Sequence, residues 1–155
     1  MSTSPQLVTI DRVVAAANEL GIELTEDVSG RAATATLSDC AVLLVLLDSV
    51  LVVRADAETD TAADSPEATI YLAANQVNSS YLDARAIVGN RGEHLVVRTE
   101  AEISTAAGLS DAQLSGALKN AFDGILRCQD AMRVLVEEME KLRDAGETPA
   151  GWRTR

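Results

Sequence analysis

One acidic stretch of the chain, residues 56–67, carries carboxylates at a spacing that could bind a metal ion. The residues that match positions 1, 3, 5, 7, 9 and 12 of a calcium-binding EF-hand loop are Asp56, Glu58, Asp60, Ala62, Asp64 and Glu67. Thr61, however, stands where that loop needs glycine for its sharp turn, Pro66 interrupts the loop, and a strand rather than a helix precedes it. The sequence therefore favours a solvated acidic connector over residues 56–64 and predicts no metal site.

Other groups suited to catalysis are few and scattered. Asp39, Asp48 and Asp83 could act as general acids or bases, but a catalytic carboxyl needs a partner within hydrogen-bond reach. The single histidine, His94, lies beside a predicted turn on the polar face of a strand, so we expect it to be exposed. The sequence has no Ser/His/Asp or Cys/His signature and no glycine-rich phosphate-binding motif. We therefore predict no catalytic residue, no cofactor and no enzyme activity.

The cysteines and the overall charge narrow the class of protein further. Cys40 and Cys128 lie in apolar patterns outside any CxxC motif, so we expect two buried thiols, with a disulfide or a redox role as the alternative. The 155 residues carry 24 acidic and 13 basic side chains, a net charge of −11. That charge argues against a nucleic-acid partner and against an anionic membrane surface. The hydrophobic content of 47% is too high for a disordered chain.

No segment of the sequence has the features of a targeting signal or a membrane span. The first residues lack the charged and apolar regions of a signal peptide. The longest apolar stretch, Cys40 to Val53, is interrupted by Asp48 and Ser49, and each half is too short to cross a bilayer. We therefore expect a cytoplasmic protein without a membrane partner.

The first half of the chain predicts one helix and three strands. Apolar residues recur at helical spacing from Thr9 to Leu20, with Thr9 as the N-cap and Gly21 just beyond the last turn. Strands are predicted at residues 33–38, where apolar and polar residues alternate, at residues 40–47, which are continuously apolar, and at residues 50–55. Asp48 and Ser49 would form a two-residue hairpin turn between the last two strands.

A second helix and a hairpin follow the acidic connector. Ser65 as N-cap and Pro66 at the first helical position predict a helix over residues 66–79. Alternating residues at 82–88 and 94–103 predict two strands joined by a turn at residues 89–92. A turn centred between Asn90 and Arg91 would place Asp83 opposite Arg98 as a cross-strand ion pair.

The last helix has the most regular pattern in the sequence. Ser110 and Gln113 form a capping box, and the helix runs to Arg143. Its apolar seam, with spacings of three and four, consists of Leu114, Leu118, Ala121, Ile125, Cys128, Met132, Leu135, Met139 and Leu142. At 1.5 Å per residue such a helix is about 50 Å long, which exceeds the diameter of a small domain. The seam therefore covers the sheet of its own chain, or part of it contacts a second chain.

The order of elements predicts the fold class and the domain limits. The order α-β-β-β-α-β-β-α predicts an α+β fold in which helices pack on an antiparallel sheet. We expect a flexible N-terminus at residues 1–8, a single domain at residues 9–143 and a C-terminal tail at residues 144–155. Trp152 in that tail is either a docking anchor or an exposed side chain.

Three strings of residues add a resemblance to a known family. They are Leu37-Ser38-Asp39-Cys40, the segment from Val50 to Ala55 (VLVVRA) and the segment from Tyr71 to Arg85 (YLAANQVNSSYLDAR). With the order of elements, they resemble the actinobacterial branch of the YbjN family, whose members are described as bacterial sensory-transduction regulators. The resemblance covers residues 9–143 and implies a fold similar to that of class I type III secretion chaperones, which are acidic homodimers that hold protein segments on apolar grooves.

The function predicted from these observations is protein binding without catalysis. We expect a homodimeric regulator or chaperone-like adaptor that holds an apolar segment of a partner protein, and the alternative is a sensor with a small molecule or ion between sheet and helix. The residues predicted at a partner or dimer interface are Ile70, Ala74, Val77, Met132, Leu135 and Met139.

Overall fold

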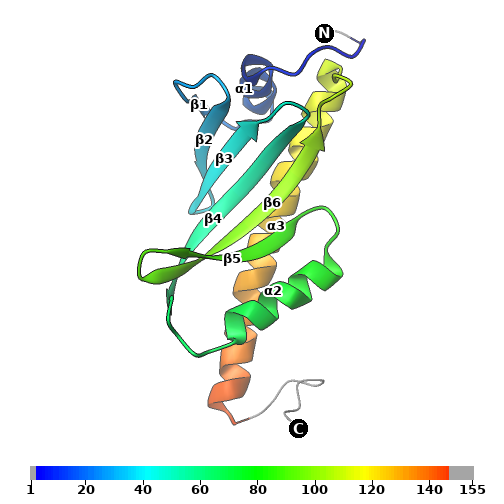
Figure 1. The fold of residues 1–155 in the computed structure, drawn as a ribbon. Helices are drawn as coiled ribbons and strands as arrows, with labels where there is room; N and C mark the ends of the chain where they lie inside the picture. The colour runs from blue at the N-terminus through cyan, green and yellow to red at the C-terminus, as the bar shows by residue number, and fades with distance from the viewer. Residues whose placement is uncertain (1–2, 147–155) are drawn as a thin grey trace.

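The computed structural model describes residues 3–146, which form three helices and one six-stranded sheet (Figure 1). The helices are α1 (Ile10–Glu19), α2 (Thr69–Ser80) and α3 (Asp111–Asp144), and the strands are β1 (Thr25–Glu26), β2 (Ala32–Leu37), β3 (Cys40–Leu46), β4 (Val50–Ala62), β5 (Arg85–Arg91) and β6 (His94–Ser104). Every strand pair is antiparallel, in the order β1-β2-β3-β4-β6-β5. The predicted α+β class and order of elements are confirmed, with the short strand β1 as an addition.

The helices cover one face of the sheet, with α3 as the central element (Figure 1). Helix α3 packs on β4, β5 and β6, while α1 contacts β1, β2 and the first part of α3, and α2 contacts β5 and α3. The seam residues Leu118, Ile125 and Cys128 are fully buried against the sheet. Each buried leucine or isoleucine of this kind contributes about 1.5–3 kcal/mol. The seam therefore covers the sheet of its own chain, and its only half-buried members are Leu135 and Leu142.

The predicted helix ends are largely confirmed at atomic detail. The Thr9 hydroxyl accepts the Arg12 N–H at 3.3 Å, and Gly21 follows α1 with φ +82°, where glycine alone is unstrained. The Ser110–Gln113 capping box is formed, with bonds of 2.8 and 3.2 Å. None of the helices within residues 3–146 is long and apolar enough to cross a membrane.

The packed part of the chain begins earlier than residue 9. Gln6 pairs with Leu109, and the Arg12 guanidinium donates to the carbonyls of Gln6, Leu7 and Leu109 and to the Asp111 carboxylate. These bonds hold the segment just before α1 against the loop that leads into α3. The tail with Trp152 lies outside the described residues.

Three sequence predictions about the middle of the chain are wrong in position. Residues 56–62 continue strand β4, which pairs with β6 up to Glu58 and, after a register shift, again at Ala62. The acidic segment therefore leaves the sheet only after Ala62. Helix α2 begins at Thr69 rather than Pro66, and the Ser65 hydroxyl caps only a local turn by accepting the Glu67 N–H. The β5–β6 turn lies at residues 92 and 93, so Ile87 rather than Asp83 is opposite Arg98.

Candidate functional site

A groove lies between the sheet and the second half of α3. Helix α1 covers the sheet near the start of α3, and α2 lies on the β5 side of the sheet (Figure 1). The parts of β3 and β4 that lie farthest from α1 therefore face the middle of α3 without a second helix over them. The cavity there, which we call the α3 groove, has a volume of about 850 Å³. Its apolar floor consists of Cys40, Ala57, Ile70, Val97, Leu126, Met132 and Val136.

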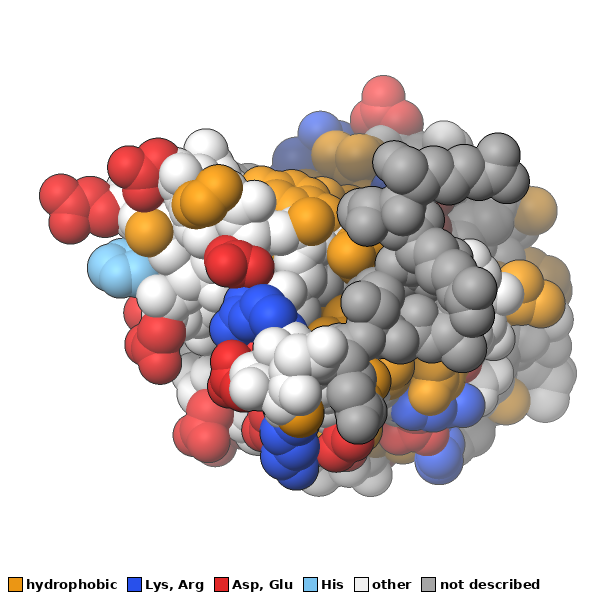
Figure 2. All heavy atoms as spheres, turned by 90° about the horizontal axis from the view of Figure 1, so that it is seen from below, with side chains coloured by type: hydrophobic (Ala, Val, Ile, Leu, Met, Phe, Trp, Pro, Cys, Tyr) orange, Lys and Arg blue, Asp and Glu red, His pale blue; other side chains and the backbone are white. Residues whose placement is uncertain are grey.

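The groove continues toward the last turn of α3. A smaller hollow of about 230 Å³ shares Thr61, Ile70 and Val136 with the groove and reaches Arg143. Figure 2 views this end of the molecule and shows apolar side chains exposed between acidic and basic ones. The two cavities adjoin at these three residues, and we call the pair of them, alongside the second half of α3, the channel.

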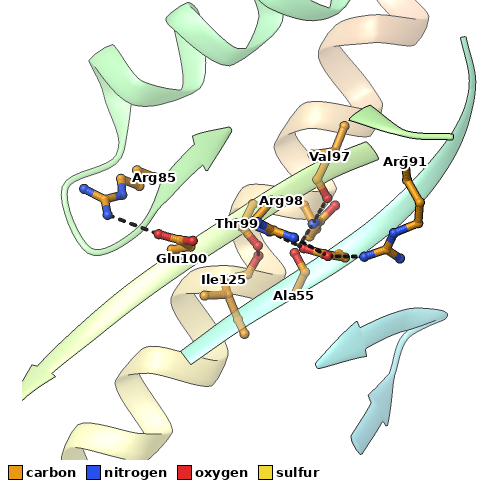
Figure 3. Close-up of polar contacts among 10 residues, drawn as sticks. Ala55, Arg85, Arg91, Val97, Arg98, Thr99, Glu100 and Ile125 are labelled. Atoms are coloured by element: carbon orange, nitrogen blue, oxygen red, sulfur yellow. Dashed lines mark hydrogen bonds and ion pairs between the residues drawn. The ribbon is translucent and has the colours of Figure 1, made fainter. Parts of the chain in front are cut away.

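Three hydrogen bonds fasten α3 to the sheet at the back of the groove (Figure 3). The Thr99 hydroxyl donates to the Ile125 carbonyl at 2.9 Å, inside the core. One turn later the Gln129 amide donates to the carbonyls of Ala55 (3.0 Å) and Val97 (2.9 Å), which belong to the neighbouring strands β4 and β6. These bonds fix the helix where it begins to separate from β3 and β4.

Asp56 is a buried carboxylate at the edge of the groove, and its partners give it a structural role. Arg98 donates two hydrogen bonds to it, at 2.8 and 2.9 Å, and Arg91 donates one at 2.7 Å (Figure 3). These bonds from Arg98, with the charges of both arginines, hold the pKa of Asp56 below its ordinary value despite its burial. Because Asp56 is occupied and its strand is extended, the residues of the EF-hand pattern do not form a calcium loop.

The walls of the groove are acidic. Across the two cavities, acidic side chains outnumber basic ones by eight to four. The four arginines form ion pairs with Asp56, Asp83, Asp130 and Glu67. The carboxylates that form no ion pair with another described residue, which we call the acidic rim, are Asp39, Glu58, Asp60 and Glu140. A cation could therefore bind the rim without competing with an existing salt bridge.

The remaining reactive groups do not come together as a catalytic site. Cys40 and Cys128 are buried free thiols, and burial raises the pKa of both. Asp48 pairs with Arg31 and Asp83 with Arg127, in different parts of the molecule, and His94 is exposed beside the β5–β6 turn. Within residues 3–146 no cluster of three histidine, cysteine or carboxylate side chains could hold a metal ion.

The six predicted interface residues do not form one surface. Ile70 and Met132 lie on the floor of the α3 groove. Val77 and Leu135 line a different cavity of about 620 Å³, the α2–α3 hollow, which also contains the exposed Val134. Ala74 and Met139 are buried and line neither cavity.

Sequence reasoning allowed for a ligand between sheet and helix but did not identify the residues of the groove, although α3 carries a signal of it. Leu126 and Val136 are apolar residues that lie off the seam, on a side of the helix that is otherwise polar. Apolar residues outside the stripe that packs on the sheet indicate a second contact surface. That signal locates the helix face, whereas the strands opposite it are known only from the structure.

Comparisons with known proteins agree on a family and a fold. The YbjN family model, described as "Putative bacterial sensory transduction regulator", matches residues 9–133. Among curated proteins the comparison found no match. The crystal structure of YbjN, "a putative transcription regulator from E. coli", is 16% identical, with a TM-score of 0.62 over 90% of this chain and 97% of that chain.

Two further solved structures are chaperone complexes. A chain of the HopA1–SchA chaperone–effector complex is 15% identical, with a TM-score of 0.50 over 84% of this chain and 98% of that one. A chain of the Yersinia pestis type III secretion chaperone SycH in complex with a fragment of YscM2 is 19% identical, with a TM-score of 0.45 over 76% and 97%. The predicted resemblance of this fold to type III secretion chaperones is confirmed.

Proposed function

This chain belongs to the YbjN family, and we propose that it is a non-enzymatic binding module that holds an apolar segment of a partner protein in the α3 groove. It would act as a regulator or a chaperone-like adaptor. The observation that carries the proposal is the open groove itself, with an apolar floor and an acidic rim. A fold shared with a chaperone of an effector protein supports protein binding, although a fold alone does not assign a function.

The shape of the channel favours a chain segment over a compact ligand. The main groove and the smaller hollow adjoin at Thr61, Ile70 and Val136, so an extended segment could place successive side chains in the two cavities along α3. Each apolar side chain fully buried there would contribute about 1.5–3 kcal/mol. Several such side chains are needed, because association itself costs several kcal/mol in lost translational and rotational entropy.

The charge of the groove favours a partner segment with basic residues. Glu58 and Asp60 flank the apolar floor and have no ion-pair partner among the described residues. A net charge of −11 would also attract a basic segment from a distance and would repel an acidic one. We therefore propose a partner segment in which apolar residues are followed or preceded by lysine or arginine.

The homodimer and its interface residues are a second part of the proposal. Of the predicted residues, Leu135, which is half-buried in the α2–α3 hollow, would contribute to a dimer contact. Ile70 and Met132 on the groove floor, and Val77 in the hollow, are almost fully buried and would support these two surfaces from beneath. Val134, which is 48% exposed beside that hollow, is the side chain best placed to reach a second copy. The cytoplasm suits this role, because two buried, unpaired thiols persist in a reducing compartment.

Site-specific crosslinking in cells would test the proposed function. A photoreactive residue at Glu58, on the groove rim, should crosslink a defined protein, while one at Glu93, in the exposed β5–β6 turn, should not. Val136→Asp, which puts a charge on the groove floor, should abolish the adduct. Asn120→Asp, which adds a charge at an exposed position of α3 outside both the groove and the α2–α3 hollow, should retain it.

The alternative function, a sensor for a small molecule, gives a different result in the same cells. A groove of about 850 Å³ is within the range of ligand pockets, so this ligand class is physically possible. Native mass spectrometry of the purified protein would then show a retained small molecule, and the crosslinker at Glu58 would give no protein adduct. That outcome would reject the adaptor role.

A further inference from the structure

We propose that the face of the sheet opposite the helices carries a binding site for the phosphate or carboxylate group of a small molecule, with Arg54 as the cation that holds this group. The inference goes beyond the proposed function and does not rest on it, because Arg54 takes no part in the α3 groove.

Arg54 points to the face of the sheet that no helix of residues 3–146 covers. Along β4, the residues Leu51, Val53 and Ala55 are fully buried beneath the helices, and side chains alternate between the two faces of a strand. In Figure 1, α3 passes behind β4 and β6, so the uncovered face is the one toward the viewer. Arg54 is therefore available to a ligand that approaches from the side away from α3.

A hollow of about 580 Å³ lies between Arg54 and the β1–β2 edge of the sheet, and we call it the β2–β4 hollow. The strand register places Thr34, Leu43 and Arg54 side by side across β2, β3 and β4. Thr25 and Thr36 line the same hollow. An anion bound there would find the planar fork of a guanidinium on one side and hydroxyl donors on the other, with an apolar surface between them.

Arg54 belongs to a local excess of positive charge in a protein that is acidic overall. Asp56, two residues later on the same face, accepts hydrogen bonds from Arg91 and Arg98 (Figure 3). The bonds from Arg98, with the charges of both these arginines and of Arg54, lower the pKa of Asp56. Three guanidinium groups thus share one carboxylate, and the Arg54 side chain forms no ion pair with another described residue.

The other carboxylates around Arg54 do not neutralise it. Glu100, its cross-strand neighbour on β6, is paired with Arg85 at 3.1 Å, and the same arginine holds Glu102 at 3.2 Å. Glu23 lines the β2–β4 hollow and is exposed to solvent. An oxyanion beside Arg54 would therefore form an ion pair that the described chain leaves open, while Glu23 would weaken its binding.

The size of the hollow and its apolar strip indicate a small molecule rather than a bare ion. Its volume lies within the range of ligand pockets, roughly 300–1,000 Å³. Leu43, which is half-buried beside Arg54, offers a surface to the body of the ligand. The hollow shares Ala41, Asp56 and Arg91 with the α3 groove, so the test below changes residues that line the hollow alone.

Nuclear magnetic resonance titration of the full-length protein with inorganic phosphate would test the site. Sodium chloride of equal ionic strength is the reference, because salt alone screens a net charge of −11. We expect saturable shifts of the Arg54 Nε–H signal and of the Thr34 and Thr36 amides. A parallel titration with acetate shows whether the site prefers a phosphate or a carboxylate group, and saturable binding of either supports it.

Three variants connect the signal to Arg54. Arg54→Gln should weaken phosphate binding by about tenfold or more, since it removes a charge-assisted hydrogen bond. Arg31→Gln makes the same charge change at an exposed position outside the hollow and should leave the affinity unchanged. Glu23→Gln, also at an exposed position, should strengthen binding because it removes an opposing charge. Circular dichroism would verify that each variant is folded.

Three results would overturn the inference. The first is the absence of any saturable shift with phosphate or acetate beyond that with chloride. The second is an unchanged phosphate affinity of folded Arg54→Gln, and the third is an equal loss in Arg54→Gln and Arg31→Gln, which would indicate general attraction to positive charge. None of these readouts involves the crosslink at Glu58, so the failure of this inference and that of the proposed function are distinguishable.

Discussion

The side chain of Asn78 is hydrogen-bonded to both polar groups of the Ala86 backbone. Its amide nitrogen donates to the Ala86 carbonyl at 2.9 Å, and its amide oxygen accepts the Ala86 N–H at 2.7 Å. Asn78 thus occupies, at one residue of the edge strand β5, the position that a neighbouring strand would take. This contact joins α2 to the sheet.

Asn78→Ala should destabilise the protein by about 1–3 kcal/mol, since each lost hydrogen bond is worth about 0.5–1.5 kcal/mol. Asn75→Ala is the matched control, because Asn75 is exposed on the same helix and its side chain makes no hydrogen bond to the described residues. Urea unfolding would measure both free energies. Equal values for the two variants would reject the role assigned to Asn78.

Replacing Ile125 by Asp should unfold the domain, because it places a carboxylate at the centre of the buried seam. The conservative variant Ile125→Val should cost only about 0.5–1.5 kcal/mol. Circular dichroism and thermal unfolding would compare the two. Normal unfolding of Ile125→Asp would contradict the packing of α3 on its own sheet.

Two glycines of α3 should respond in opposite ways to alanine. Gly116 has open space around a new methyl group, so Gly116→Ala should stabilise the helix by about 0.5–1 kcal/mol. At Gly124 the added carbon would lie 3.2 Å from the Asp83 carboxylate, which is paired with Arg127, so the same gain should be cancelled or reversed. Thermal unfolding of both variants, and of Gly124→Ala combined with Asp83→Ala, would show whether Asp83 is the cause.

The Asp56 ion pairs should make stability depend on pH in the acidic range. Because the folded pKa of Asp56 lies below the unfolded value of about 3.9, its contribution is fully present above that value and is lost as the pH falls through the folded pKa. At pH 7, Asp56→Asn should cost about 2–3 kcal/mol, since hydrogen bonds to charged groups are at stake.

Asp48→Asn is the control for Asp56, because Asp48 pairs with Arg31 at 3.5 Å on the exposed surface. Its cost should stay within about 0.5 kcal/mol. Urea titrations from pH 7 to pH 2.5 would follow the difference between wild type and Asp56→Asn. A difference that did not shrink at low pH would rule out the assigned linkage.

The elements that were predicted best from the sequence are those in which buried residues recur at a regular spacing. The seam of α3 and the capping box at Ser110 were located because burial against a sheet requires a spacing of three and four. The turn of the β5–β6 hairpin was misplaced because a shift by an even number of residues keeps the apolar faces matched. Apolar alternation alone could not distinguish the two registers.

The groove could not be predicted, for a geometric reason. Its floor combines Ile70, Ala57 and Val136, which come from a helix, a strand and another helix far apart in the sequence. They meet only because α3 crosses the sheet at an angle, and no local pattern encodes that angle. The acidic residues 56–62 were assigned to a loop because their charges suggested solvent, whereas pairing with β6 keeps them extended.

The position of α3 at the end of the domain has a consequence during protein synthesis. Leu44, Leu51 and Val53 belong to strands made early, yet the face that carries them is buried under a helix that starts at Asp111. The ribosome adds about 5–20 residues per second, so this apolar face stays exposed for several seconds before α3 has been synthesised. The nascent chain therefore presents an uncovered sheet, and the domain closes only when its last 34-residue helix has emerged.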